Sequence, residues 1–272
     1  MRRHAVLLAL WTASAVAADP PHLDAAGRAG YREYQTARDH RSFAVAPGGA
    51  WGWSAAAPTA ETAEAEALAA CRSNTRQQCV NYSTDGRSVF DAAAWPTLWG
   101  PYADAGQARR APEGRHPGER FPDLAFVDAA GKPARLSALA GKVVLVHFWA
   151  SWCGPCRREL GELQRLWQGL KDRRDIAFVL LQAREPYAAA SRWARAQGIA
   201  MPLADSGATG SEDATFRRAD GRRLADRDIA PGFPTTYVLD KRGLVVFGHV
   251  GEVHDWPAYR DFLLDTARRS GR

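Results

Sequence analysis

The sequence is short of lysine, methionine and long apolar runs, and each scarcity excludes a class of protein. Basic charge comes almost wholly from arginine, because the lysines are only Lys132, Lys142, Lys171 and Lys241. The arginines are scattered among acidic residues, and no nucleic-acid-binding motif accompanies the formal net charge of +6. Nucleic-acid binding usually leaves a clustered basic stripe, so we expect no nucleic-acid partner.

No apolar segment reaches the roughly 20 residues that a membrane-spanning helix needs. At the N-terminus a basic start at residues 2–4 precedes a short apolar core at 5–13 and small residues at 16–18. This order is typical of a secretory signal peptide, and the run is too short for the alternative, a membrane anchor. We expect residues 1–18 to be removed before Asp19, which leaves an exported protein with no stable membrane span.

Methionine and cysteine limit the metal chemistry that the chain can support. Met1 and Met201 are the only methionines, whereas copper carriers favour methionine and histidine ligands. The cysteines fall into two pairs, Cys71 with Cys79 and Cys153 with Cys156, and only the second pair has the spacing of metal ligands. We therefore expect no metal site and no cofactor.

The second cysteine pair carries the strongest chemical signal in the chain. Cys153-Gly154-Pro155-Cys156 follows the apolar run Val143–Trp149 and opens an amphipathic helix pattern. A helix N-terminus carries partial positive charge and unpaired N–H groups, which favour a thiolate over a thiol. A thiolate at Cys153 can attack a partner's disulfide, and Cys156 can then resolve the mixed disulfide.

Residues 19–95 predict a small α+β domain with the element order ββαβ. Short apolar runs at 42–45 and 51–54 flank a Pro-Gly-Gly turn, and Thr59 can cap a helix over 60–72 before a strand at 79–82. So small a core usually needs a staple, which a Cys71–Cys79 disulfide can supply. The alternative is a second redox centre or a relay between domains.

Residues 96–116 are rich in Pro, Gly, Arg and Ala, a composition typical of a linker. Beyond it, Gly198 should end a helix, Asp255 should cap one, and Lys241-Arg242-Gly243 should form a hairpin turn. The alternation predicts an α/β fold with a mixed sheet flanked by helices. The expected strands are 143–149, 176–182, 235–240 and 244–250, and the expected helices are 155–171, 187–197 and 256–268.

The segment Phe148–Cys156 resembles thioredoxins, and most closely their exported, TlpA/ResA-like branch. The resemblance extends over about residues 117–268 and includes the further segments Pro122–Leu124, Leu136–Lys142 and Gly232–Thr236. It implies a thioredoxin-like domain over 117–272 and a protein thiol–disulfide oxidoreductase. By the same resemblance, Cys153 is the nucleophile, Cys156 the resolving thiol, and Pro234 a cis-proline beside them.

The resemblance also implies where the protein acts and on what. Members of this branch are periplasmic, reduce disulfides of partner proteins such as apocytochrome c, and are recharged by a membrane thiol reductase. Two alternatives stay open: a disulfide oxidase or isomerase, and a non-catalytic assembly or binding factor on the same scaffold. The N-terminal part faintly resembles small exported Cys-containing domains of unknown function at 50–54 and 67–71, which implies no activity.

Several residues around the motif depart from the family pattern or have two interpretations. His147 stands where the family has aspartate or asparagine, and it is either a base for Cys156 or a neutral core residue. Glu159 matches an acidic residue of the branch and either handles protons or is a solvated helix residue. Phe233 is bulkier than the residue usual before the cis-proline and, close to the thiols, it either shields the disulfide, docks an apolar substrate side chain or simply packs. Trp152 of the motif is a further supporting residue of the expected site.

Two further departures concern the backbone. Gly161 stands where the branch commonly has a proline, which leaves the usual helix kink in doubt. Residues 206–229 form a longer connection than usual, and we expect a charged surface insertion that shapes partner choice or is mobile.

Overall fold

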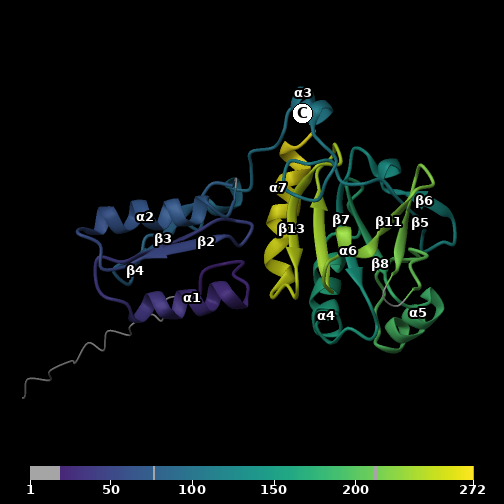
Figure 1. The fold of residues 1–272 in the computed structure, drawn as a ribbon, viewed down its shortest axis with the longest axis horizontal. Coiled ribbons are helices and arrows are strands. Elements are labelled where there is room, and N and C mark those ends of the chain that lie inside the picture. Colours follow the sequence, from purple (N-terminus) through teal and green to yellow (C-terminus); the bar gives the residue numbers. More distant parts are fainter. Residues whose placement is uncertain (1–18, 76, 211–212, 272) are drawn as a thin grey trace, which may run out of the picture.

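The computed structural model describes residues 19–75, 77–210 and 213–271 as two units joined by one connection (Figure 1). The expected signal peptide, residues 1–18, lies outside the described residues. Within those described ranges, no helix has the length and apolar character needed to cross a membrane.

The N-terminal unit contains the expected ββαβ order with an additional helix in front of it. The antiparallel sheet has the strand order β2-β1-β3-β4. Helix α2 begins where predicted, because the Thr59 side chain accepts a hydrogen bond from the Thr62 N–H. The elements are α1 (Ala25–Thr36), β1 (Ser42–Val45), β2 (Trp51–Ser54), α2 (Ala60–Arg72), β3 (Val80–Thr84) and β4 (Arg87–Ser88).

Helix α1 was absent from the sequence-based prediction because two glycines interrupt its helical pattern. Gly27 and Gly30 lower helix propensity, yet both lie directly against the indole of Trp51. A Cβ at Gly30 would stand 2.6 Å from the Trp51 ring. These glycines therefore allow the close packing of α1 on β2.

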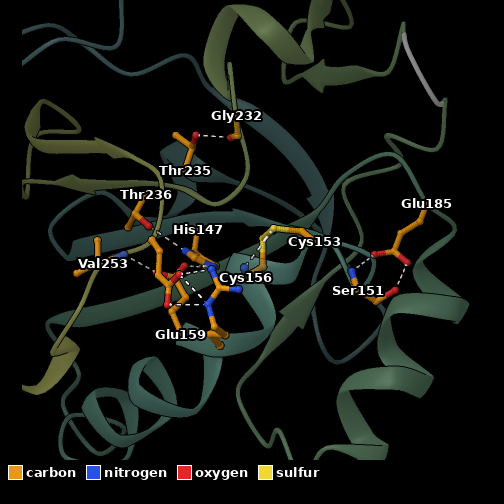
Figure 2. Close-up of a disulfide and its surroundings, with 12 residues drawn as sticks. His147, Ser151, Cys153, Cys156, Glu159, Glu185, Gly232, Thr235, Thr236 and Val253 are labelled. Carbon is orange, nitrogen blue, oxygen red and sulfur yellow. Dashed lines mark hydrogen bonds and ion pairs between the residues drawn. A yellow bond between two sulfur atoms is a disulfide. The ribbon is translucent and has the colours of Figure 1, made fainter. Parts of the chain in front are cut away.

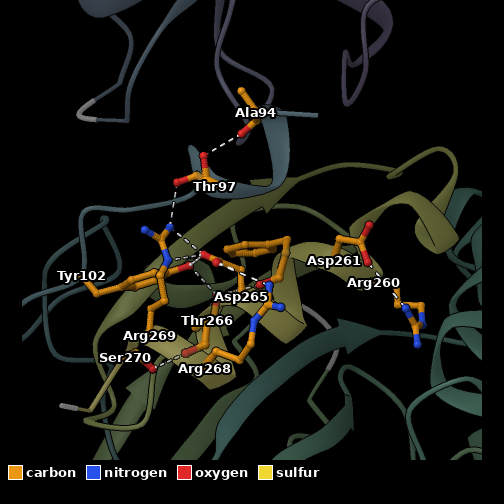
Figure 3. Close-up of polar contacts among 11 residues, drawn as sticks. Ala94, Thr97, Tyr102, Arg260, Asp261, Asp265, Thr266, Arg268, Arg269 and Ser270 are labelled. Atoms are coloured by element: carbon orange, nitrogen blue, oxygen red, sulfur yellow. Dashed lines mark hydrogen bonds and ion pairs between the residues drawn. The ribbon is translucent and has the colours of Figure 1, made fainter. Parts of the chain in front are cut away.

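The segment that the sequence predicts as a linker contains regular structure and packs against the larger unit. Residues 96–116 include helix α3 (Ala105–Arg110) and most of the 3-10 helix η1 (Trp95–Thr97). Trp99 is buried and stacks on Phe262 with ring centroids 4.0 Å apart. The Tyr102 hydroxyl donates to Asp265 at 2.9 Å (Figure 3). The aromatic residues within the Pro- and Gly-rich stretch attach it to the C-terminal helix α7 (Arg260–Arg269).

The larger unit is built on a five-stranded mixed sheet with the order β13-β12-β7-β8-β9. The central strand β7 runs parallel to β8 and antiparallel to β12, which forms a hairpin with β13. The strands are β7 (Val143–Trp149), β8 (Ile176–Gln182), β9 (Leu203–Ala204), β12 (Thr235–Leu239) and β13 (Val245–Val250).

Alternate residues of β7 enter two separate cores, as the period of a strand requires. Val143, Leu145 and Trp149 pack in the core that contains buried residues of α4 (Gly154–Gln168) and α7. Val144, Val146 and Phe148 pack in a second core, against residues of a second sheet. That sheet, with the order β11-β10-β5-β6, comprises β5 (Leu124–Val127), β6 (Pro133–Arg135), β10 (Thr215–Arg218) and β11 (Arg223–Ala225).

The second sheet corrects the prediction for residues 206–229. Much of this segment forms β10, β11 and the short helix α6 (Asp226–Ile229) rather than a surface insertion. Phe216 on β10 is buried against Phe148, with ring centroids 5.0 Å apart. The segment has many charged residues and only one aromatic residue, Phe216, so the alternation of buried and exposed residues along β10 was not recognised from the sequence.

Two expected helix ends have different outcomes. Gly198 ends α5 (Tyr187–Ala196) with a left-handed φ of 71°, as predicted. Asp255 does not cap the last helix: its φ is 59°, and it makes no side-chain capping bond to the 3-10 helix η3 (Trp256–Tyr259). The sheet, its helices and the 241–243 hairpin turn confirm the thioredoxin-like α/β fold preceded by a small α+β unit.

The remaining connections close the edges of the five-stranded sheet. The Gly118 N–H donates to the Val245 carbonyl at 2.8 Å, and the Val245 N–H donates to the Glu119 carbonyl at 2.9 Å. At the opposite edge, β9 has only two residues. Val127 exchanges backbone hydrogen bonds with Asp205, which follows it.

Candidate active site

Cys153 stands at the N-cap of α4, just beyond the carboxyl end of β7 (Figure 2). It forms a disulfide with Cys156, and its sulfur accepts a hydrogen bond from the Cys156 N–H at 3.2 Å. Cys153 is 4% exposed and Cys156 is fully buried. The more accessible sulfur therefore lies at the helix N-terminus, where a thiolate is stabilised.

Two ionisable side chains lie buried together behind the disulfide, His147 from β7 and Glu159 one turn after Cys156 (Figure 2). His147 Nε2 is 3.4 Å from Glu159 Oε1, and both side chains are fully buried. His147 Nδ1 is 2.9 Å from the Thr236 hydroxyl. Glu159 is therefore not the solvated helix residue that one interpretation of the sequence offered.

Burial sets the protonation of this pair. Loss of hydration raises the pKa of Glu159 to about 8, although the hydrogen bond from the Val253 N–H opposes the shift. Loss of hydration also lowers the pKa of His147 to about 3. At neutral pH both groups are thus mainly uncharged, because burial penalises the ionised form of each.

The cis-proline immediately precedes β12, the strand next to β7. The Phe233–Pro234 peptide bond is cis, and the β12 register pairs Thr235 with Phe148. This register brings Pro234 to the end of the sheet where the motif begins. Phe233 packs edge-on against Trp152, with ring centroids 5.8 Å apart, and Trp152 remains 53% exposed. An apolar surface therefore borders the disulfide.

Two consecutive residues that the sequence analysis missed, Arg184 and Glu185, support both sides of this surface. Glu185 accepts hydrogen bonds from the Ser151 N–H and hydroxyl, each 2.5 Å long (Figure 2). The Arg184 guanidinium lies over the Phe233 ring at 5.9 Å and forms an ion pair with Asp226 at 2.5 Å.

The positions of Arg184 and Glu185 in the sequence could have indicated that they lie near the motif. They follow β8 closely, and β8 runs parallel to β7 with Gln182 opposite Trp149. The carboxyl ends of parallel strands meet at one edge of a sheet, where ligand sites of α/β folds gather. Charged residues directly after β8 were therefore candidates for contact with the motif.

The other cysteine pair lies apart from this site in the N-terminal unit. Cys71 at the end of α2 and Cys79 just before β3 form a disulfide with Cα atoms 6.2 Å apart. Both cysteines are buried, in a small cluster with Ala44, Ala46 and Ala67. Within residues 19–75, 77–210 and 213–271, no group of three or more His, Cys, Asp or Glu side chains could hold a metal ion.

Comparisons with known proteins point to one family. The family model described as Redoxin matches residues 116–263. The thioredoxin-like protein YneN of Bacillus subtilis (strain 168) is 30% identical over 135 residues, which cover 49% of this chain and 71% of that protein. The thiol-disulfide oxidoreductase ResA of Bacillus anthracis is 28% identical over 135 residues, covering 50% and 70%.

A solved structure adds a weaker match. The crystal structure of a DsbF homologue from Corynebacterium diphtheriae is 21% identical, with a TM-score of 0.42, and covers 60% of this chain and 90% of its own. The matched family residues, 116–263, include both cysteines of the motif, the buried pair and the cis-proline.

Proposed function

Because this chain belongs to the redoxin family and is a thiol–disulfide oxidoreductase, we propose that it is exported and reduces disulfides of extracytoplasmic partner proteins. The observation that carries this proposal is the placement of Cys153 at the N-cap of α4 with the buried Cys156 one turn behind it. In such a pair the more accessible Cys153 can attack a partner's disulfide, and the buried Cys156 can then resolve the mixed disulfide.

In the first step the Cys153 thiolate attacks one sulfur of the partner's disulfide. A bond forms between that sulfur and Cys153, the partner's disulfide breaks, and its other sulfur leaves as a thiolate. The N-terminus of α4 stabilises the attacking thiolate, and the Cys156 N–H donates to the same sulfur.

In the second step Cys156 gives up its proton and attacks Cys153. We propose the ionised form of Glu159 as the proton acceptor: with a pKa of about 8, roughly a tenth of the carboxyl groups are ionised at pH 7, and this pKa is close to the value of about 8.5 of an ordinary thiol. The partner sulfur that was bonded to Cys153 leaves as a thiolate, and the Cys153–Cys156 disulfide forms. The partner thus gains two electrons and the protein loses two.

His147 serves in this scheme as a positioning residue rather than as the base. A pKa near 3 leaves its ring neutral at neutral pH, so it holds little affinity for a proton from Cys156. Held at Nδ1 by the Thr236 hydroxyl, the ring lies with Nε2 3.4 Å from Glu159 Oε1 and so limits the positions open to the carboxyl group. Of its two interpretations from sequence, the neutral core residue has the better support.

The partner's disulfide would approach over Trp152 and Phe233. An extended segment beside the cis-proline can pair with backbone groups, and an apolar side chain of that segment can contact the two rings. A membrane thiol reductase would then return electrons to the pair, and cytochrome c maturation is one process that needs such a reductant. Two disulfides in one chain accord with an oxidising compartment.

A trapping experiment tests the reaction and identifies the partner. In the Cys156→Ser variant the mixed disulfide at Cys153 cannot be resolved, so we expect covalent complexes with partner proteins that dithiothreitol releases. The Cys153→Ser variant is the matched control and should trap nothing. Equal trapping by both variants, or by neither, would contradict attack at Cys153.

The direction of electron flow and the export each have a separate measurement. A reductant should reduce insulin, whereas an oxidising reduction potential together with failure to reduce insulin would favour the oxidase or isomerase alternative. Full biological activity of Cys153→Ser would favour a non-catalytic assembly or binding factor. N-terminal sequencing of the protein from a periplasmic extract should begin at Asp19.

A further inference from the structure

The loop at residues 251–255, between β13 and η3, is held by helix α4 from one side. The Val253 N–H donates to Glu159 Oε2 at 2.8 Å (Figure 2). The neighbouring residue of α4, Arg158, forms an ion pair with Glu252 of the loop. Its Nε and Nη2 donate to Glu252 Oε2 at 3.0 Å and 2.6 Å. The loop thus supplies a hydrogen bond to the carboxyl group behind the disulfide.

The N-terminal unit contacts the following helix η3 through His22. The His22 ring stacks on Tyr259, with centroids 4.4 Å apart, and lies 4.9 Å from the ring of Trp99. His22 Nδ1 is 2.7 Å from the Pro47 carbonyl, which ties the ring to its own unit. Tyr259 in turn lies against Trp256 at 5.3 Å, so the packing continues to the end of the 251–255 loop.

The backbone on both sides of this contact is in an unfavourable conformation. His22 has a φ of 64° and Asp255 a φ of 59°. The left-handed region is uncommon for residues other than glycine, even though histidine and aspartate tolerate it better than most. Such conformations persist only where the surroundings hold them, and these two residues flank the contact between the units.

We infer that the N-terminal unit controls the proton-accepting carboxyl group of Glu159, and that His22 is a positioning residue which acts through Tyr259 and the 251–255 loop. This inference rests on the proposed role of Glu159 in proton transfer. The groups that face Glu159 are His147 from β7, Glu252 of the loop and the indole of Trp256 from η3. Loosening the loop exposes the carboxyl group to water and removes the bond from Val253.

The test uses the full chain with His22→Ala and measures the reduction potential of the Cys153/Cys156 pair against pH. The plot changes slope where the thiols and Glu159 titrate, and the break that Glu159→Gln removes belongs to Glu159. We expect this break to move by about one pH unit toward the ordinary value of a carboxyl group. Burial is the largest cause of the raised pKa, and water entry reduces it. His22→Phe keeps a flat ring on Tyr259 and should restore the wild-type break.

Two further variants make the result decisive. His22→Leu fills the same volume without a ring to stack, so it should also move the break, which covers the case that His22→Ala does not fold. Val89→Ala changes an exposed residue of the same unit and should leave the break in place. An unmoved break in the histidine variants, even with lowered stability, would overturn the coupling. A wild-type pair that exchanges no disulfides would instead refute the proposed function.

Discussion

His147 and Glu159 lie buried against each other behind the disulfide, with His147 Nε2 3.4 Å from Glu159 Oε1. The motif and its resemblance placed both near Cys156, because one lies on the preceding strand and the other one turn along the helix. Their contact was not predictable, since it depends on the orientation of α4 over β7. The direction of each pKa shift was not predictable either, because burial causes both shifts and burial depends on how the whole core packs.

Opposite pKa shifts in this pair predict an unusual dependence of stability on pH. Between pH 4.5 and about 8 the folded protein retains the Glu159 proton that the unfolded chain releases, so stability falls as pH rises. Below pH 6.5 the unfolded chain protonates His147 and the folded protein does not, so stability falls as pH falls. Each slope approaches about 1.4 kcal/mol per pH unit, and the two oppose each other between pH 4.5 and 6.5.

Urea unfolding between pH 3 and 9 measures this effect. Wild type should be most stable between pH 4.5 and 6.5 as far as this pair is concerned. Glu159→Gln carries no proton to lose and should lack the decline between pH 6.5 and 8. The same decline in both proteins would show that other groups cause it.

Two glycines with opposite surroundings allow a second prediction at the level of single residues. Gly161 lies in α4 with open space where a Cβ would be, so Gly161→Ala should stabilise the protein by about 0.5–1 kcal/mol. A Cβ at Gly52 would stand 2.4 Å from the Cys71 nitrogen, so Gly52→Ala should destabilise it. Chemical denaturation of both variants is the measurement, and equal signs would contradict the packing described.

At the scale of elements, residues near strand ends organise the site. Strand β8 delivers Arg184 and Glu185 to the motif, and α6 delivers Asp226, which holds Arg184 over Phe233. The sequence predicted β8 to the residue but treated α6 as part of an insertion. A short helix buried through one isoleucine and one aspartate has too little hydrophobic pattern to be recognised.

The Arg184–Asp226 ion pair should contribute through what its loss leaves behind. Arg184→Leu leaves the buried Asp226 carboxylate without its guanidinium, which should cost about 3 kcal/mol of unfolding free energy. The double variant Arg184→Leu/Asp226→Asn should recover most of that loss. Arg222→Leu, which breaks the exposed pair with Asp220, is the control and should change stability by less than about 1 kcal/mol. Equal losses in both single variants would contradict a specific role for the buried pair.

At the scale of the whole molecule, sequence reasoning predicted the thioredoxin-like α/β fold and the α+β elements that precede it. It did not predict how the connecting segment, residues 96–116, packs. Trp99, Tyr102 and the Thr97 carbonyl attach the connecting segment to α7, and composition alone cannot distinguish an attached segment from a free one. Contacts between residues over 160 positions apart in the chain decide that difference.

The Cys71–Cys79 disulfide should stabilise the small unit without entering the redox reaction. The double variant Cys71→Ala/Cys79→Ala loses a short closed loop, and we expect the unit to be less stable by about 2–3 kcal/mol. Insulin reduction should persist at 25 °C. Thermal unfolding followed by tyrosine and tryptophan absorbance measures the loss, and abolished insulin reduction in a folded variant would assign the pair a redox role.

The backbone bonds of Gly118 and Glu119 to Val245 have a consequence for solubility. A sheet edge offers unpaired N–H and C=O groups that can recruit strands from other chains and start aggregation. Here one edge is blocked over part of β13, and the other ends in a strand of two residues, which offers little to pair with. The sheet therefore offers few sites for unspecific strand addition besides the one proposed for an extended partner segment beside Cys153.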